Sequence, residues 1–334
     1  MLSRMGRDYK LTGATAMNSR AICFTLFSTI AIAIAASLPA QAQRARVFVS
    51  VTGNDANPCT AGSPCKTFQA AHDAVLAGGE ISVLDTGGYG TLIINKAVSI
   101  VAVGVEASIA IPSGGTGITI NALSTDKVAL RGLTIDGGGV GFGGISFNSG
   151  QSLTIDDCVV RGTTNDGFDF RSEATTPQTL TVSNSRFYDT GRIGLAVIAF
   201  SSGATSVSID RTRFSGNASA GLDVDGSFGT GPLTATVTDS VSANNGNRGI
   251  LVGTITGHSP VNVSLTRTQV LGNSTGLELN GSPVTVWVAQ STISGNTTTG
   301  YSAVNGAVLN SYSNNFLAAA NGPPGAVLGS ASPQ

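Results

Sequence analysis

Charged residues are scarce in this sequence. They make up 11% of its 334 residues, the formal net charge is -1, and only four lysines occur, at Lys10, Lys66, Lys96 and Lys127. Nucleic-acid binding depends on a concentration of basic side chains, and no basic run is present. The composition therefore excludes a nucleic-acid-binding protein.

Aromatic residues and long apolar runs are also few. Aromatics make up 6% of the chain with a single tryptophan, whereas glycine supplies 44 residues. After residue 42 no apolar run is long enough to cross a bilayer, so we expect no membrane span once the leader is removed. Glycine combined with many Thr, Ser, Val, Ile and Asn residues favours short strands and turns over long helices.

The start of the chain resembles a secretory leader, predicted over residues 1–42. The run 21–36 is apolar, and the Ala-Gln-Ala sequence at 40–42 is typical of a signal-peptide cleavage site. The mature chain would begin at Gln43, and Met17 is an alternative initiator because a signal of this kind needs nothing before it. We therefore expect a secreted or periplasmic protein.

The cysteines fit an exported protein. Cys23 leaves with the leader, and Cys59 and Cys65 are separated by a loop of five residues. Because the compartment outside the membrane is oxidising, we predict a disulfide between Cys59 and Cys65. Cys158 then remains unpaired, and its place in the repeat described next predicts a buried, unreactive thiol rather than a nucleophile.

One template recurs seven times between residues 130 and 301. It consists of an apolar residue, a second apolar residue five positions later, which is replaced by Ser242 in one unit, and a glycine followed by an apolar residue about twelve positions after the first. The first residues, here called the anchors, are Leu130, Ile155, Val182, Ile209, Val237, Leu265 and Val288. The glycines, here called the coil glycines, are Gly144, Gly167, Gly194, Gly221, Gly249, Gly276 and Gly300.

The spacing of the template predicts a solenoid. Successive anchors lie 25, 27, 27, 28, 28 and 23 residues apart, whereas the distance from anchor to coil glycine stays between 11 and 14. Variation in length is therefore confined to one loop per coil, as expected where strands must stack in register and a turn faces solvent. We expect the coil glycines to be required by a positive φ at the start of a strand.

Four asparagines occupy one position of the repeat. Asn217, Asn245, Asn273 and Asn296 each follow their anchor by eight residues. Stacked in adjacent coils, their side-chain amides would form a ladder of hydrogen bonds. Three of them also begin glycosylation sequons, but the ladder explains all four.

The remaining segments predict the ends of the solenoid. Residues 66–77 carry apolar side chains at helical spacing and should form an amphipathic helix that covers the open first coil. His72 on this helix is expected at the surface of the cap. We accordingly expect a cap with the disulfide loop over residues 43–80, a β-helix over 81–316, and a flexible tail over 317–334.

These features resemble the right-handed parallel β-helix of the pectin-lyase-like superfamily. The template carries the resemblance, together with an opening segment, Val-Ser-Val-Thr-Gly-Asn-Asp at 49–55 and Pro-Cys-Lys-Thr-Phe-Gln-Ala-Ala at 64–71, that is similar to the cap of many exported polysaccharide-active members. It implies an all-β fold of about nine to ten coils with a capping helix. It does not imply one function, because the superfamily includes lyases, hydrolases, epimerases and members without known chemistry.

The motifs of two well-known activities in this superfamily are missing. The pectate-lyase pattern of a tryptophan strand with Asp-His and an Arg-x-Pro-x-x-Arg stretch does not occur. Polygalacturonase motifs are matched only by Asn165-Asp166-Gly167-Phe168-Asp169 and Asp156-Asp157, in reversed order and without Gly-His-Gly or Arg-Ile-Lys. Calcium, which such lyases use, is the only cofactor that the resemblance implies, and no metal ligands are identified.

A weaker set of candidates lies two residues after the coil glycines. These positions are Ser146, Asp169, Ala196, Asp223, Leu251, Glu278 and Ser302, which should share one outer sheet face. Asp169 and Asp223 would lie about 9.6 Å apart, with Asp225 about 6.6 Å along the strand from Asp223. Inverting glycosidases separate their carboxyl groups by about 6.5 to 9.5 Å. Asp169, Asp223 and Asp225 are therefore candidate catalytic residues; the alternative is a solvated acidic stripe.

Candidate substrate-binding residues are Trp287, Glu278 and Arg171. Trp287 should point outward and could stack on a sugar ring on the face that carries the carboxylates, or pack under the C-terminal tail or a partner subunit. The sequence thus favours an exported protein whose outer sheet face binds a polysaccharide or cell-surface glycan, as a divergent lyase or hydrolase or as a binding module. The alternative is a rigid structural rod without a small-molecule site.

Overall fold

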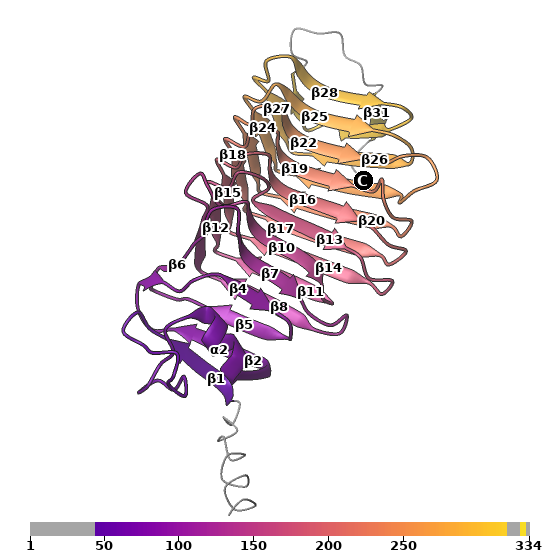
Figure 1. The fold of residues 1–334 in the computed structure, drawn as a ribbon. Helices are drawn as coiled ribbons and strands as arrows, with labels where there is room; N and C mark the ends of the chain where they lie inside the picture. Colours follow the sequence, from indigo (N-terminus) through magenta and orange to yellow (C-terminus); the bar gives the residue numbers. More distant parts are fainter. Residues whose placement is uncertain (1–43, 319–327, 332–334) are drawn as a thin grey trace, which may run out of the picture. The chain divides into compact units, whose positions relative to one another are not determined.

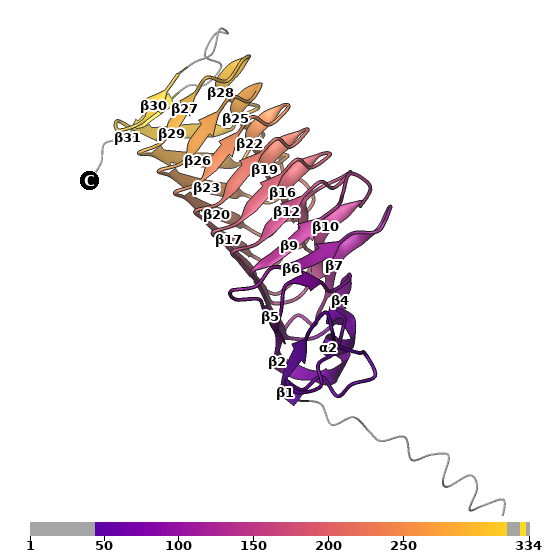
Figure 2. The same ribbon diagram turned by 90° about the vertical axis from the view of Figure 1, so that its left-hand side faces the viewer.

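The computed structural model describes residues 44–318 and 328–331, so the predicted leader lies outside the described residues. In this part of the chain almost every element is a strand, and all strand pairs join in parallel within three sheets. The strands of each sheet are stacked one above the next along the axis of the solenoid (Figures 1 and 2). The sheets hold twelve, nine and ten strands, which confirms a parallel β-helix of about ten coils.

The twelve-stranded sheet contains the anchors. Its strands in spatial order are β1 (Arg44–Val49), β2 (Val75–Val83), β5 (Val98–Val101), β8 (Lys127–Arg131), β11 (Ser152–Asp156), β14 (Gln178–Ser183), β17 (Thr205–Asp210), β20 (Leu233–Thr238), β23 (Val261–Thr266), β26 (Val284–Ala289), β29 (Val308–Tyr312) and β31 (Leu328–Ala331). All seven anchors pair in one continuous register and are buried. The predicted inward stack is therefore confirmed.

The ten-stranded sheet contains the second apolar positions of the template. Its strands are β3 (Gly87–Gly88), β6 (Ala107–Ala110), β9 (Leu133–Asp136), β12 (Val159–Arg161), β15 (Arg186–Tyr188), β18 (Arg213–Ser215), β21 (Val241–Ala243), β24 (Gln269–Leu271), β27 (Thr292–Ser294) and β30 (Phe316–Leu317). Phe187 and Phe214 occupy this position in adjacent coils, and their rings stack with centroids 5.5 Å apart. Stacked rings of this kind fill the interior without the voids that would weaken it.

The nine-stranded sheet contains the strands that start within one residue of the coil glycines. It consists of β28 (Thr299–Val304), β25 (Thr275–Asn280), β22 (Arg248–Gly253), β19 (Ala220–Asp225), β16 (Ile193–Ala199), β13 (Phe168–Ser172), β10 (Gly143–Ser149), β7 (Thr116–Asn121) and β4 (Leu92–Ile94). Along each strand the side chains alternate between the core and the outer face, so β19 buries Leu222 and Val224 and directs Asp223 and Asp225 outward. The outer face of this sheet carries the candidate carboxylates.

The asparagine ladder is present as predicted. The side-chain amide of Asn217 donates to Asn245 at 2.9 Å, that of Asn245 to Asn273 at 3.0 Å, and that of Asn273 to Asn296 at 3.0 Å. All four residues are buried. Each acceptor oxygen also receives the backbone N–H of the preceding asparagine, so the ladder satisfies buried polar groups at the turn into the nine-stranded sheet.

The reason given for the coil glycines is corrected by the structure. None of the coil glycines from Gly144 to Gly276 has a positive φ. At Gly221 an added Cβ would lie 2.8 Å from the carbonyl oxygen of Gly249 in the next coil and 2.8 Å from the amide nitrogen of Asn245. Glycine is therefore required by close approach of the next coil and of the asparagine ladder, not by backbone conformation.

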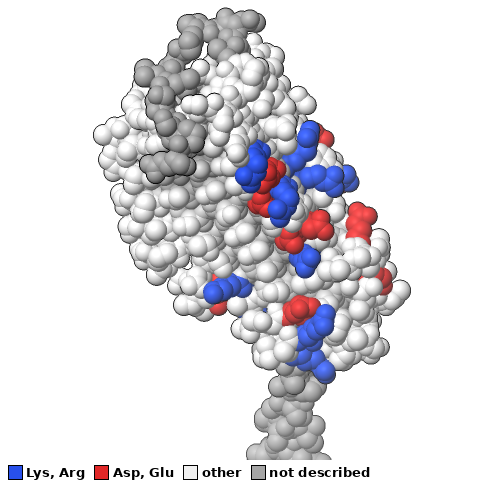
Figure 3. Space-filling model, turned by 180° about the vertical axis from the view of Figure 1, so that it is seen from behind, with Lys and Arg blue, Asp and Glu red and all other residues white. Residues whose placement is uncertain are grey.

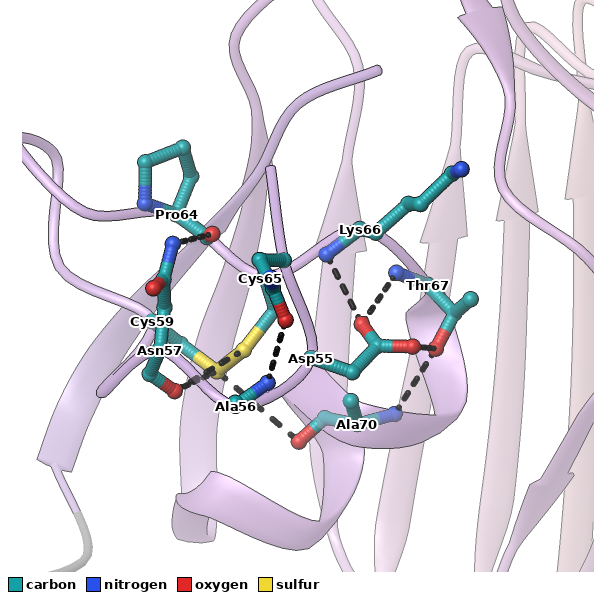
Figure 4. The surroundings of a disulfide bond; sticks show 10 residues. Asp55, Ala56, Asn57, Cys59, Pro64, Cys65, Lys66, Thr67 and Ala70 are labelled. Atoms are coloured by element: carbon teal, nitrogen blue, oxygen red, sulfur yellow. Dashed lines mark hydrogen bonds between the residues drawn. A yellow bond between two sulfur atoms is a disulfide. The ribbon is translucent and has the colours of Figure 1, made fainter. Parts of the chain in front are cut away.

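The disulfide lies beside the start of the only helix in the described residues, α2 (Phe68–Ala74) (Figure 4). Cys59 and Cys65 are bonded, as predicted. The carboxylate of Asp55 accepts hydrogen bonds from the backbone N–H groups of Lys66 and Thr67 at 2.8 and 2.9 Å and from the Thr67 hydroxyl. The Thr67 hydroxyl in turn caps the helix by accepting the N–H of Ala70. The loop and the helix N-terminus therefore form one unit.

The ends of the solenoid differ from the prediction. The helix is shorter than 66–77 because the chain enters β2 at Val75, whose side chain packs in the core. His72 is buried, not at the surface as expected, and burial lowers its pKa. At the other end, β31 pairs with β29 within the segment expected to be a flexible tail; residues 319–327 and 332–334 of that segment lie outside the described residues.

Charged side chains at the turn after the twelve-stranded sheet form ion pairs between coils. The residues two positions after the anchors have φ of 46 to 54° from Asp157 to Arg267. Arg267 binds the carboxylate of Asp239, in the preceding coil, with two hydrogen bonds of 2.7 Å. Figure 3, which shows the molecule from behind, has basic and acidic side chains in mixed groups with white surface between them. Exposed pairs of this kind contribute little to stability.

Candidate carboxylate site on the nine-stranded sheet

The candidate residues lie in one row across the outer face of the nine-stranded sheet. Backbone pairing aligns the positions predicted to share this face, in the order Ser146, Asp169, Ala196, Asp223, Leu251, Glu278 and Ser302. Asp169 and Asp223 are thus two coils apart, and Asp225 follows on the same face of β19. The predicted arrangement of the three carboxylates along the sheet is confirmed by this register.

Asp223 lies in an unfavourable setting for a charged group. Its neighbours in the row are Ala196 and Leu251, and its Oδ1 atom is buried with no hydrogen-bond partner among the described residues. Burial, followed by the negative charge of Asp225, raises the pKa of Asp223 to about 7, against the opposing effects of Arg192 and Arg248. This carboxyl group can therefore hold a proton near neutral pH.

Asp223 and Asp225 line one hollow in the surface. The hollow has a volume of about 260 Å³, and its other lining residues are Ser227, Arg248, Leu251, Gly253, Thr254, Ile255, Glu278 and Asn280. The backbone N–H of Ser227 donates to Oδ1 of Asp225 at 2.8 Å and so fixes that carboxylate. Asp223 and Asp225 therefore face the same space with different surroundings.

Asp169 lies in a different part of the row. Arg171, two residues later on β13, donates to Oδ2 of Asp169 at 2.7 Å, while Oδ1 of Asp169 is buried and unpaired among the described residues. Burial raises the pKa of Asp169, and the hydrogen bond and charge of Arg171 oppose that effect. Arg171 itself is engaged by this ion pair, so it does not project freely toward a ligand.

Two arginines border Asp223 that the sequence had not identified as part of the site. Arg192 forms a two-fold hydrogen bond with buried Asp166, at 2.8 and 2.7 Å, and Arg248 forms one with Glu278, at 2.7 and 3.3 Å. Arg192, Asp166 and Arg248 each precede a coil glycine by one or two positions, whereas Glu278 follows its coil glycine by two. A table of the residues before each coil glycine would have revealed them. Glu278 is therefore held by an arginine within the hollow.

Trp287 does not share a face with the carboxylates. It lies on β26 of the twelve-stranded sheet, where it pairs with Ser264 and Asn310, and its ring lies 5.9 Å from that of Tyr312. The prediction that one face holds both Trp287 and the acidic residues is wrong, because the three sheets of the solenoid present separate outer faces. Trp287 is 38% exposed beside a second aromatic ring. Any sugar-stacking role for it would be independent of Asp223.

The described residues offer no clear cation site. Within 44–318 and 328–331, no three His, Cys, Asp or Glu side chains are arranged to hold a metal ion. Asp166 and Glu278, near Asp223, are instead neutralised by arginines at hydrogen-bonding distance. Calcium thus has no identified ligands in this part of the chain. Over the same residues no helix has the length and apolar character of a membrane span.

Comparison with known families agrees with this architecture. The family described as "Right handed beta helix region" matches residues 80–231 and 116–317. The chain belongs to the right-handed β-helix family. No curated protein sequence matches it.

Solved structures similar to this β-helix share its fold at low sequence identity. Pectate lyase Pel9A has 18% identity and a TM-score of 0.56, and the match covers 84% of this chain and 79% of the lyase. Tailspike protein 2 of the Escherichia coli O157:H7 bacteriophage CAB120 has 11% identity and a TM-score of 0.53, covering 78% of this chain and 43% of the tailspike. The A-module of the Azotobacter vinelandii mannuronan C-5 epimerase AlgE4 has 15% identity and a TM-score of 0.46, and the match covers 71% of this chain and 79% of the module. At these identities the similarity shows the fold alone.

Proposed function

We propose that this β-helix is an exported protein that binds an extended polysaccharide along the outer face of its nine-stranded sheet and hydrolyses it with Asp223 as the general acid. The observation that carries the proposal is the Asp223 carboxyl group, whose pKa is raised to about 7 in a hollow that it shares with a second carboxylate. A carboxyl group with a pKa near the working pH can both hold and release a proton during turnover.

The shape of the face suits a linear glycan. Each coil adds about 4.8 Å of surface along the stack, so several coils span several sugar units. The similar fold of a protein named as a pectate lyase supports a carbohydrate ligand, although the lyase motifs are missing from this chain. The disulfide supports export, because such bonds persist in oxidising compartments.

The acid and base roles can be assigned from the positions of the carboxyl groups. Asp223 would protonate the glycosidic oxygen as the bond to the anomeric carbon breaks, and Asp225 would take a proton from the water that attacks this carbon. Their Cα atoms lie about 6.6 Å apart along the strand, and those of Asp223 and Asp169 about 9.6 Å apart across two coils. The first distance lies within the range of about 6.5 to 9.5 Å for inverting enzymes and the second lies at its upper limit. Of the two partners, Asp225 lines the same hollow as Asp223 and Asp169 does not.

The experiment is incubation of the protein beginning at Gln43 with a panel of uronate-containing and neutral polysaccharides. New reducing ends are measured, together with the ultraviolet absorbance that an elimination product would show. We expect new reducing ends without that absorbance, and we expect the rate to fall above about pH 7 because Asp223 then loses the proton that it must donate. Asp223→Asn should abolish the release of reducing ends while it preserves binding.

Asp239→Asn is the matched control, because Asp239 is an acidic residue paired with an arginine outside the nine-stranded sheet. It should leave the rate unchanged. Equal rates in Asp223→Asn and in the unchanged protein would refute the catalytic role. Failure to bind or cleave any polysaccharide in the panel would instead favour the alternative, a rigid rod that uses the β-helix only as structure.

A further inference from the structure

A pair of phenylalanine rings, one exposed and one half-buried, lies just after the C-terminal ends of two neighbouring strands of the nine-stranded sheet. Phe200 directly follows β16 and Phe228 follows β19 by three residues. Their rings stack with centroids 5.0 Å apart and an angle of 25° between their planes. Phe228 is 56% exposed, and such a ring adds little to the stability of the solenoid core. The folding of the chain therefore does not explain why an aromatic residue occupies this loop.

The loops that carry the pair are packed on each other in successive coils. The backbone N–H of Phe200 donates to the carbonyl of Ser172 at 2.9 Å, and that of Thr230 donates to Ser201 at 3.0 Å. A Cβ added at Gly229 would lie 2.6 Å from the carbonyl oxygen of Ser201, so these two loops are in close contact. The rings are thus held on a hydrogen-bonded support, which limits the entropy lost when a ligand binds.

A basic side chain flanks the pair on the side of Asp169. The guanidinium carbon of Arg171 lies 5.6 Å from the centre of the Phe200 ring, while the same group is paired with Asp169. This contact fixes the Phe200 ring in the coil before Phe228. Arg171 therefore contacts Phe200 and Asp169 and does not line the hollow near Asp223.

The loop that carries Phe228 begins at the hollow that contains Asp223 and Asp225. Ser227 lines the hollow and donates its N–H to Asp225, and Phe228 is the next residue in the chain. Ile255, in the following coil, also lines the hollow and is 52% exposed. The lining of the hollow therefore combines apolar side chains, Leu251 and Ile255, with carboxyl and guanidinium groups, and the loop of Phe228 starts at its edge.

We infer that Phe228, supported by Phe200, binds the apolar face of a pyranose ring of the polysaccharide while the hydroxyl groups of the glycan contact the polar floor. A pyranose has C–H groups on its faces and hydroxyl groups at its edges, so it matches a site with this division. The flat face of an aromatic ring complements such a C–H surface. This inference rests on the proposed function and gives Phe228 the role that the sequence had suggested for Trp287.

The test is affinity gel electrophoresis of the protein in gels that contain hydroxyethyl cellulose, dextran, polygalacturonate or alginate. We expect the unchanged protein to be retarded by at least one of these polymers. Phe228→Ala should weaken that retardation by about tenfold in apparent Kd, and Phe228→Leu by a similar factor, because leucine preserves the apolar contact with Phe200 but lacks a ring face. Phe228→Tyr should retain binding.

Phe142→Ala is the control, because Phe142 is 51% exposed and lies before β10, at the opposite end of the strands of the same sheet. It should bind as the unchanged protein does. Retardation that is equal in Phe228→Ala and the unchanged protein would overturn this inference and leave the proposed function standing. No retardation of the unchanged protein in any gel would overturn both.

Discussion

Replacement of Asp223 by asparagine should stabilise the protein at neutral and alkaline pH. The buried Oδ1 of Asp223 has no hydrogen-bond partner among the described residues, and an Asp223→Asn side chain keeps the shape of the protonated acid without its charge. The pKa of Asp223 is raised from the ordinary value of 3.8 to about 7 in the folded protein, chiefly by burial. The folded state therefore binds the proton more tightly than the unfolded state does.

The size of the effect follows from the shift in pKa. One pKa unit corresponds to 1.36 kcal/mol, so a rise from 3.8 to about 7 lowers the free energy of unfolding by up to about 4 kcal/mol at high pH. Below pH 4 both states are protonated and nothing is lost. Between pH 4 and 7 the unfolded state releases its proton while the folded state retains it, so stability falls with rising pH. Above about pH 7 the loss is complete and constant.

The assay is chemical denaturation of the unchanged protein and of Asp223→Asn at intervals from pH 4 to pH 8. We expect similar unfolding midpoints at pH 4 and a higher midpoint for Asp223→Asn at pH 8, with most of the divergence between pH 4 and 7. Asp239→Asn is the control, because the pKa of Asp239 is lowered by its hydrogen bonds with Arg267. Parallel pH profiles for Asp223→Asn and the unchanged protein would show that Asp223 is solvated, and would remove the basis for its role as an acid.

Two further predictions concern the interior of the solenoid. Asn245→Ala should lower the free energy of unfolding by about 2 to 4 kcal/mol, measured by denaturant, because Asn217 and Asn273 each lose a buried partner. Asn280→Ala, which removes an exposed hydrogen bond between side-chain amides, should cost less than about 1 kcal/mol, and equal losses would contradict the ladder's role. In the protein that begins at Gln43, Cys158 should react with a thiol reagent only after denaturation, because burial raises its pKa to about 12. The denatured protein should contain one reactive thiol. Rapid reaction of the native protein would contradict the burial of Cys158.

The interior of the fold could be predicted because it repeats. An inward position must satisfy the same packing in every coil, so apolar residues recur there at regular spacing and the anchors can be recognised in the sequence. The asparagines of the ladder recur, and can be recognised, for the same reason. The reason for the coil glycines could not be read in this way. Their spacing is visible in the sequence, but the close approach of Gly249 to Gly221 depends on the distance between coils.

The outer face was harder to predict because its residues do not repeat. The sequence placed Asp223 and Asp225 on the correct face but did not show that Oδ1 of Asp223 would be buried without a hydrogen-bond partner, because that depends on how the neighbouring Ala196 and Leu251 pack beside it. It also joined Trp287 to a face on which it does not lie. Periodicity shows whether a side chain points in or out, whereas a site depends on which of the three sheets carries it.

The position of Asp223 is not required by the fold. Its neighbours in the row are an alanine and a leucine, and the outward positions of other coils carry serine, so an uncharged residue would suit the same backbone. At neutral pH the aspartate lowers stability by as much as about 4 kcal/mol, a large fraction of what a folded domain possesses. Local conflicts of this kind are expected where a residue serves chemistry rather than folding. The instability that Asp223 introduces is thus the physical reason to assign it a role in catalysis. If this assignment is correct, the Asp223→Asn variant should be both more stable than the unchanged protein and inactive.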